Sequence, residues 1–191
     1  MFLNNKFPLL LASGSPARKE LLRQIGIIPD LVLAPEIEEQ PAKKELPSAY
    51  SKRVAIAKCE KAMNLHDGYV VLAADTIAAC GRRIIQKVRS AEEAFSFISL
   101  LSGRQHRVYT TVCLGIPGVG VRVKHSCTKI KFKRLSKDEI EQYIALGEWQ
   151  GKAGSYGIQG AAAAFIERIN GSYSGVVGLP LCETAKLLQS Y

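Results

Sequence analysis

The sequence predicts an α/β fold in which a mixed, twisted sheet is flanked by helices. First, apolar β-rich runs alternate along the chain with segments of helical periodicity. Second, tight turns at residues 81–83 and 117–118 join neighbouring runs, which predicts antiparallel pairs beside any parallel ones. Third, no repeat, low-complexity tract or linker interrupts the 191 residues. We therefore expect one domain over residues 1–191, either fully compact or as two lobes that share a cleft.

The first half of the chain opens with a buried strand that leads through small residues into a helix. We expect Ser15 to cap this helix, with Pro16 in its first position. The other expected elements are a strand over 28–34, a charged loop over 36–47, a helix over 48–64 and a strand over 69–74 that ends at Asp75.

The second half predicts helices whose start signals are clear in the sequence. Ser136 followed by Glu139 is typical of a capping box. The expected elements are a short strand at 84–85, a helix from Ser90 to residue 101, paired strands over 107–116 and 119–132, a helix over 136–146, a strand over 161–169, a turn and short strand over 170–180, and a closing helix over 181–189.

Composition narrows the class of partner. Lys and Arg number 26 against 17 Asp and Glu, a formal charge of +9, which suits an anionic partner. The basic residues are spread along the chain, as on a solvated surface. A nucleic-acid binder is one alternative, but aromatic residues are only 7% and no aromatic–basic interleaving or helix-turn-helix pattern is present. We therefore expect no nucleic-acid partner.

Cysteine usage and hydropathy bear on location. The five cysteines are widely spaced and never form CxxC, which argues against a zinc knuckle or a disulfide framework. Reduced thiols indicate the cytoplasm. No run approaches the roughly 20 apolar residues of a membrane helix, and no export signal is convincing. We expect a cytoplasmic protein without a membrane partner.

The junction between the first strand and helix is a candidate anion site. Backbone N–H groups at a helix start, joined by Ser13, Ser15 and Arg18, can receive a phosphate. The pattern lacks the GxxxxGK[ST] of a Walker A loop. A well-capped helix without chemical importance explains it equally well.

Three further positions carry polar chemistry. Asp75, followed by Thr76, can bind a hard divalent cation or activate a water, or can simply cap a turn. Lys87 can neutralise polyphosphate charge or be solvated. Gln159, in the small-residue run 152–160, offers a donor and an acceptor to the edge of a base, although a Gly-rich turn between strands also accounts for that run.

Covalent catalysis is not expected. No serine lies in GxSxG, and no Cys–His pair is suggested by the sequence. Of the three histidines, His66 and His125 are expected at the surface, and a turn from helix to strand accounts for His106.

Taken together, these segments resemble the Maf family of nucleotide pyrophosphatases. The matching blocks occur in the family's order over about residues 10–188, and they are LASGSPARKELL, VLAADT, GRRIIQKVRSAEEA, LSGRQHRVYT, KAGSYGIQG and INGSYSGVVGLPLCET.

The resemblance implies a function and a set of roles. Family members split a nucleoside triphosphate into a monophosphate and pyrophosphate, need Mg²⁺ or Mn²⁺, and are typically homodimers with a cleft between two lobes. By position, Asp75 corresponds to the catalytic base. The remaining matches are the metal-side acid Glu39, the lysines Lys58 and Lys87, the glutamine Gln159, and the phosphate-facing Ser13 and Arg18.

The sequence departs from the family pattern in three places. Ala17 replaces the usual arginine after Ser-Pro, Val88 replaces a proline, and Ser90 replaces a frequent acid. In the family, the arginine that Ala17 replaces is associated with the branch that favours dTTP and UTP. Thr76 and Gln159 fit that branch, whereas Ala17 does not. We therefore expect pyrimidine triphosphates, including modified ones. The alternative is a catalytically weakened Maf-like regulator of cell division.

Overall fold

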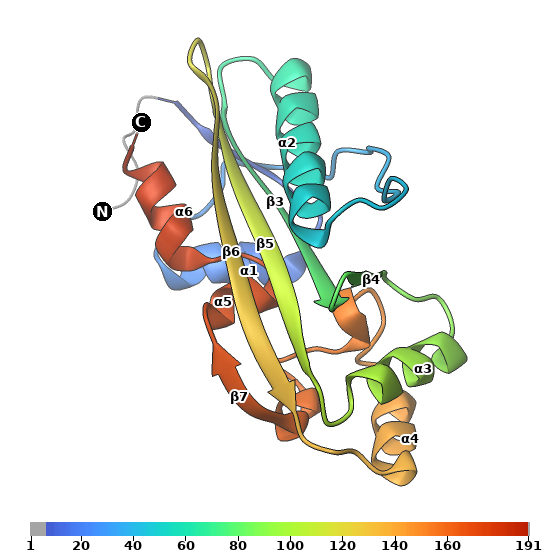
Figure 1. Cartoon of the computed structure of the whole chain (residues 1–191). Helices are drawn as coiled ribbons and strands as arrows, with labels where there is room; N and C mark the ends of the chain where they lie inside the picture. The colour runs from blue at the N-terminus through green and yellow to red at the C-terminus, as the bar shows by residue number, and fades with distance from the viewer. Residues whose placement is uncertain (1–6, 191) are drawn as a thin grey trace.

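The computed structural model describes residues 7–190, and its centre is a seven-stranded mixed sheet (Figure 1). The strands are β1 (Leu9–Ala12), β2 (Leu31–Val32), β3 (Val70–Cys80), β4 (Arg83–Ile85), β5 (Gln105–Ile116), β6 (Gly120–Phe132) and β7 (Ile166–Asn170). Their order is β2-β1-β3-β5-β6-β7, with β4 paired to β3. β1 runs parallel to β2 and β3, and all other pairs are antiparallel. The predicted mixed α/β sheet is therefore confirmed.

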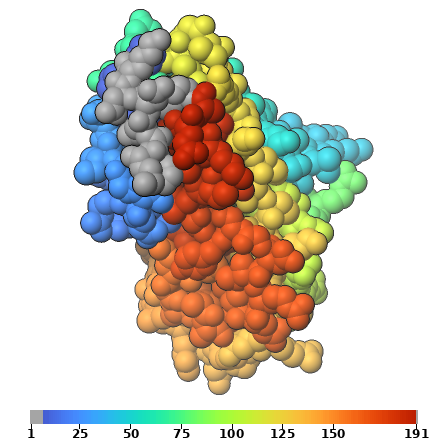
Figure 2. Space-filling view, turned by 90° about the vertical axis from the view of Figure 1, so that its left-hand side faces the viewer, coloured from blue at the N-terminus to red at the C-terminus, as the bar shows by residue number. Residues whose placement is uncertain are grey.

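Helices cover both faces of the upper part of the sheet in Figure 1. They are α1 (Pro16–Gln24), α2 (Pro47–Leu65), α3 (Ala91–Leu101), α4 (Lys137–Ala145), α5 (Tyr173–Val177) and α6 (Leu181–Leu188). Successive side chains of a strand point to opposite faces. Leu72 accordingly packs in the cluster with α1 and α6, while its neighbour Val71 packs against α2. Figure 2 shows α6, in red, between the blue N-terminal segment that contains α1 and the yellow β6.

A separate apolar cluster lies at the lower end of β5 and β6. Phe132 and Ile130 pack there with Ile98 of α3 and Tyr143 of α4. The chain also forms two short 3₁₀ helices, η1 (Ala153–Ser155) and η2 (Ala161–Phe165), and η2 contributes Ala162 and Phe165 to this cluster. The long strands β3, β5 and β6 thus connect cores at their two ends.

The structure corrects two of the strands that the sequence predicted. β3 does not end at Asp75 but continues to Cys80, because β5 pairs with it as far as Ala79 and β4 pairs with its last residues. Of the strand predicted over residues 161–169, the first part, residues 161–165, forms η2 instead. The extended part begins at Ile166 and is β7. Alanine favours helical backbone, which accounts for η2.

Two more corrections concern helix starts. The short strand expected within 170–180 is instead α5, whose first turn is capped by the Ser172 hydroxyl accepting from Gly175 N–H. Ser15 stands at the N-cap of α1, but its side chain makes no capping hydrogen bond. The capping box of Ser136 and Glu139 is confirmed. Among the described helices, none is long and apolar enough to cross a membrane.

The histidines also differ from expectation. His106 lies inside β5 and is 1% exposed, rather than in a turn. His125 is half-buried and shares a hydrogen bond of 2.8 Å between its Nδ1 and Thr111 Oγ1. His66 is also half-buried, with its ring edge-on to Tyr69.

The buried His106 predicts a pH dependence of stability. Burial lowers the pKa of His106 from its ordinary 6.5 to about 4. Between these values the unfolded chain binds the proton and the folded chain does not, so the free energy of unfolding falls as pH falls from 6.5 to 4. The shift in the pKa of His106 changes the free energy of unfolding by about 3 kcal/mol over this pH range. Urea unfolding at a series of pH values should show this slope in the wild type and a smaller slope in His106→Gln, where the lowered pKa of His125 still acts in the same direction; equal slopes would contradict it.

Candidate active site at a gap in the sheet

One edge of β3 is left unpaired in its middle. β5 pairs with one edge of β3 over residues 71–79, so β1 and β4 share the other edge. β1 covers residues 70–73 and β4 covers 78–80, which leaves residues 74–77 without a strand beside them. Asp75 and Thr76 lie in this gap. Their side chains point to opposite faces of the sheet, yet both reach the cleft that opens there.

The cleft at the gap has a volume of about 510 Å³. It brings together every site residue predicted from the sequence, namely Ser13, Ser15, Arg18, Glu39, Lys58, Asp75, Thr76, Lys87 and Gln159. These residues come from the β1–α1 turn, the loop before α2, α2 itself, β3, the segment after β4 and the loop before η2. Folding therefore joins segments that are far apart in the sequence.

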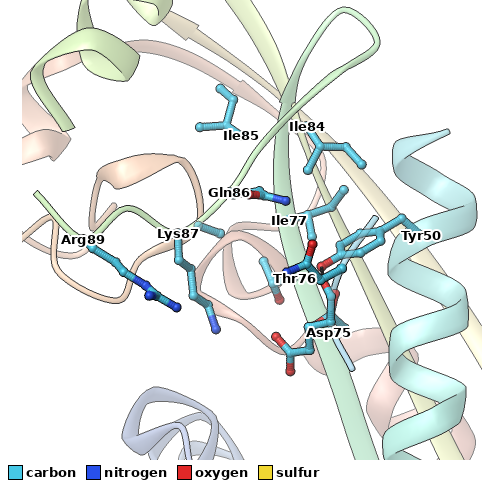
Figure 3. A pocket seen from close by; sticks show the side chains of 12 residues that line it. Tyr50, Asp75, Thr76, Ile77, Ile84, Ile85, Gln86, Lys87 and Arg89 are labelled. Atoms are coloured by element: carbon cyan, nitrogen blue, oxygen red, sulfur yellow. Dashed lines mark hydrogen bonds between the residues drawn. The ribbon is translucent and has the colours of Figure 1, made fainter. Parts of the chain in front are cut away.

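A second hollow of about 320 Å³ extends the cleft past β4. It shares Asp75 and Lys87 with the larger cleft and continues along Tyr50 and Ile84. Figure 3 shows Lys87 and Arg89 extending from the segment after β4 toward the side of Asp75, with Tyr50 entering from α2. The two hollows form one elongated site with charged walls.

Lys58 bridges the two carboxylates of the site. Its Nζ lies 2.9 Å from Asp75 Oδ1 and 2.6 Å from Glu39 Oε1. Lys58 and Asp75 are 8% and 6% exposed, so this is a buried charge pair. Burial raises the pKa of the Glu39 carboxyl, but the cations Lys58, Lys87 and Arg18 outweigh it and hold that pKa below its ordinary value. Glu39 is therefore ionised at neutral pH.

One oxygen of Asp75 is without a partner in the described part of the chain. Oδ2 is buried and accepts no hydrogen bond. An unpaired buried carboxylate oxygen is costly unless a proton donor or a cation meets it. Oxygen ligands suit Mg²⁺ or Mn²⁺, which use one or two carboxylates together with phosphates and water. Asp75 and Glu39 supply two carboxylates of this kind, and residues 7–190 hold no group of three or more His, Cys, Asp or Glu side chains that could bind a metal ion by themselves.

Arg18 ties three segments together beside the gap. Its Nε donates to Gly178 O at 2.8 Å, Nη1 to Ser13 Oγ at 2.8 Å, and Nη2 to Thr76 Oγ1 at 3.2 Å. Burial lowers the pKa of Arg18 below its ordinary value, and the neighbouring Asp75 and Glu39 offset only part of this effect. Each terminal nitrogen retains a second N–H, so Arg18 can hold the β1–α1 turn in place and still face an anion.

The structure adds cleft residues that the sequence did not single out. Lys152 lines the wall opposite the β1–α1 turn, and Arg89 lies near Lys87. Tyr50 donates its hydroxyl to the Glu39 backbone carbonyl, which holds the acidic loop against α2. Ser51 pairs with Thr111 Oγ1 at 2.9 Å beneath Asp75. Lys152 begins the same small-residue run as Gln159, and that proximity was the available signal.

Removing the bridging cation should destabilise the protein. Lys58→Met leaves Asp75 buried without its counter-charge, a loss that typically costs about 3–5 kcal/mol. Lys61→Met, three residues further along α2 and exposed, is the matched control and should change little. Urea unfolding measures both. If Lys58→Met unfolds at the wild-type urea concentration, the buried pair does not exist as described.

Comparisons with known proteins show what the whole chain is similar to. A family model described as Maf-like protein matches residues 8–191. The chain is 51% identical over 183 residues to a "Nucleoside triphosphate pyrophosphatase" of Ehrlichia canis (strain Jake), covering 96% of this chain and 95% of the other. It is 50% identical over 190 residues to a "dTTP/UTP pyrophosphatase" of Wolbachia pipientis wMel, covering 99% and 94%.

Among solved structures, a HAM1 protein from Coxiella burnetii aligns with a TM-score of 0.53 at 14% identity, over 97% of this chain and 100% of that one. At this identity the likeness concerns the fold. With a family model over nearly its whole length and relatives at about half identity, the chain belongs to the Maf family.

Proposed function

We propose that this protein hydrolyses a nucleoside triphosphate between its α- and β-phosphates, giving a nucleoside monophosphate and pyrophosphate. The observation that carries the proposal is the single cleft in which Lys58 joins two carboxylates while other cations face them. Relatives at about 50% identity are named for this class of reaction. A free triphosphate, rather than a nucleic acid, is the proposed ligand of this cleft.

The chemistry follows from the charges on the two sides of the gap. A water attacks the α-phosphorus and loses a proton to Asp75, whose Oδ2 has no other partner in the described structure. The bond from the α-phosphorus to the bridging oxygen breaks, and pyrophosphate leaves with the bond's electrons. Arg18, Lys58 and Lys87 neutralise the charge that builds on this leaving group.

A divalent cation, Mg²⁺ or Mn²⁺, is the proposed cofactor. Glu39 and Asp75 would hold it, because both carboxylates line the cleft and lie on the same lysine. When bound, the cation supplies further neutralisation of the phosphates and orders water. Lys58 keeps the two carboxylates together and offsets part of their mutual repulsion.

The proposed substrates are dTTP, UTP or modified pyrimidine nucleotides. Gln159 lines the cleft, and its amide can read the edge of a base. Thr76 lines the same cleft, with its hydroxyl held by Arg18, Thr110 and Gly178. Ala17 lines the same cleft and leaves out the long cation that family members commonly carry there. Relatives with a pyrimidine name and with a general name match this chain about equally, so the base preference rests on the side chains alone.

The structure does not favour a catalytically weakened regulator. Val88, which stands where the family has proline, is 8% exposed and packs in the lower core. Lys87 beside it still lines the cleft. We further propose a homodimer and a cytoplasmic location, and the free cysteines, of which Cys59 and Cys113 are buried, suit the reducing environment of that compartment.

Replacing the proposed base should abolish turnover. Asp75→Asn keeps the size of the side chain but removes the proton acceptor, so the rate of pyrophosphate release should fall by about 10²–10⁴-fold. Asp67→Asn, at an exposed position before β3, is the control and should retain wild-type rates. Near-normal pyrophosphate release by folded Asp75→Asn would reject the assignment.

Metal removal gives a second test. Chelation with EDTA should abolish pyrophosphate release, and added Mg²⁺ or Mn²⁺ should restore it, because the proposed cation would neutralise phosphate charge and order water beside Glu39 and Asp75. The assay uses dTTP and UTP beside the purine triphosphates. Full activity in excess chelator would remove the proposed cofactor from the account.

A further inference from the structure

His106 belongs to a sequence block, LSGRQHRVYT, to which the proposed reaction gives no task. It lies near the start of β5, with its ring in the lower core and 1% of its surface exposed. Its Nε2 is 2.8 Å from the hydroxyl of Tyr156, while its Nδ1 is buried without a partner in the described structure. A histidine kept at this cost suggests a purpose beyond filling space.

The partner of His106 belongs to the wall of the cleft. All residues from 150 to 159 except Gly154 and Ser155 line this wall. Tyr156 is one of them, and Lys152 and Gln159 are its polar members nearby. Tyr156 is 4% exposed, with its ring edge-on to His106 and Phe132 at centroid distances of 5.5 and 4.9 Å. His106 therefore stands directly behind the surface that faces the substrate.

The backbone of this wall needs external support. Gly154 has φ of +79° and packs so closely on β3 that a Cβ there would lie 2.8 Å from Ala78 Cβ. Ser155 follows with φ of +61°, a left-handed conformation that non-glycine residues rarely adopt, and its buried hydroxyl has no partner in residues 7–190. Strained backbone of this kind persists only where its surroundings fix it.

Two phenol groups provide that support from the lower core. Tyr143 of α4 accepts the backbone N–H of Gly157 through its hydroxyl at 3.1 Å. Tyr156 reaches His106 one residue earlier in the same wall. The strained turn at residues 154–155 is thus followed at once by two anchored positions, and Gln159 comes only two residues after the second.

We propose that the His106–Tyr156 hydrogen bond is a latch that positions the substrate-binding wall of the cleft. His106 is a positioning residue, because it acts through Tyr156 and touches no substrate. The inference rests on the proposed function of the same cleft. The wall contacts parts of the nucleotide away from Asp75, so releasing the latch weakens binding of substrate and transition state alike.

A matched pair of substitutions separates the latch from simple packing. His106→Gln keeps a side-chain amide that can bond to the Tyr156 hydroxyl, whereas His106→Met has similar length and no such group. Tyr156→Phe removes only the hydroxyl. Ser102→Ala removes another hydrogen bond of the lower lobe, from the Leu135 N–H at 2.8 Å, without touching the wall, and serves as control.

Steady-state kinetics of pyrophosphate release provides the first readout. His106→Met and Tyr156→Phe should raise KM about 5- to 100-fold, the loss expected when one partner of a buried hydrogen bond is removed, with kcat nearly unchanged. His106→Gln should recover most of the KM, and Ser102→Ala should keep it. The double variant should be no worse than either single one. A fall in kcat alone, additive effects, or unchanged KM in His106→Met would overturn the latch.

A second readout does not need catalysis. Hydrogen exchange of residues 150–160 and the fluorescence of Trp149, the one tryptophan of the chain, both report on this wall. Faster exchange in His106→Met and Tyr156→Phe, but not in Ser102→Ala, supports the latch; equal exchange in all overturns it. If the wild type releases no pyrophosphate from any triphosphate, the proposed function fails, while this measurement still decides on the latch.

Discussion

The ammonium of Lys58 between Asp75 and Glu39 is the interaction on which the site depends. Two carboxylates facing one cleft repel each other, and one of them is almost fully buried. A single cation within hydrogen-bonding distance of both carboxylates offsets their repulsion. It also holds the loop that carries Glu39 against α2. Without that bridge, the cations on the other side of the cleft would face no organised partner.

The gap in the sheet explains why this cluster can face a substrate. A strand paired on both edges presents its side chains only above and below the sheet. Because β1 ends before β3 does and β4 starts later, the edge of β3 at Asp75 and Thr76 is open. Asp75 meets α2 on one side, and Thr76 meets Arg18 on the other, so both faces of the sheet contribute to one cleft.

Much of this arrangement could be predicted from the sequence, for identifiable reasons. The helices with start signals, such as Ser136 with Glu139, and the strands joined by tight turns have local causes. β3 continues past Asp75 because it pairs with β5, which is distant in the sequence. The end predicted near Asp75 is instead close to the point where the neighbouring β1 stops pairing with β3. The stretch after Gly160 was predicted as a strand, although its alanines favour the helical backbone that residues 161–165 adopt.

The sequence predicted which residues belong to the site, but it did not predict which of them contact one another. Lys58 was identified through the family pattern, whereas its double contact depends on the fold of the loop before α2. Tyr50 could not be predicted because a helical tyrosine has no distinctive local signal, and for Lys152 the one signal was its place in the small-residue run that contains Gln159. His106 was read as part of a turn, since its burial follows from the aromatic cluster around Phe132 and Tyr156 rather than from its neighbours in sequence.

A crystal structure with a non-hydrolysable α,β-imido nucleoside triphosphate and Mn²⁺ tests the central claim most directly. We expect the triphosphate in the gap of the sheet, with Asp75 and Glu39 on the metal side and Arg18 and Lys87 against the phosphates. A nucleotide bound with its phosphates outside this cleft, and with the Lys58 bridge untouched, would contradict it.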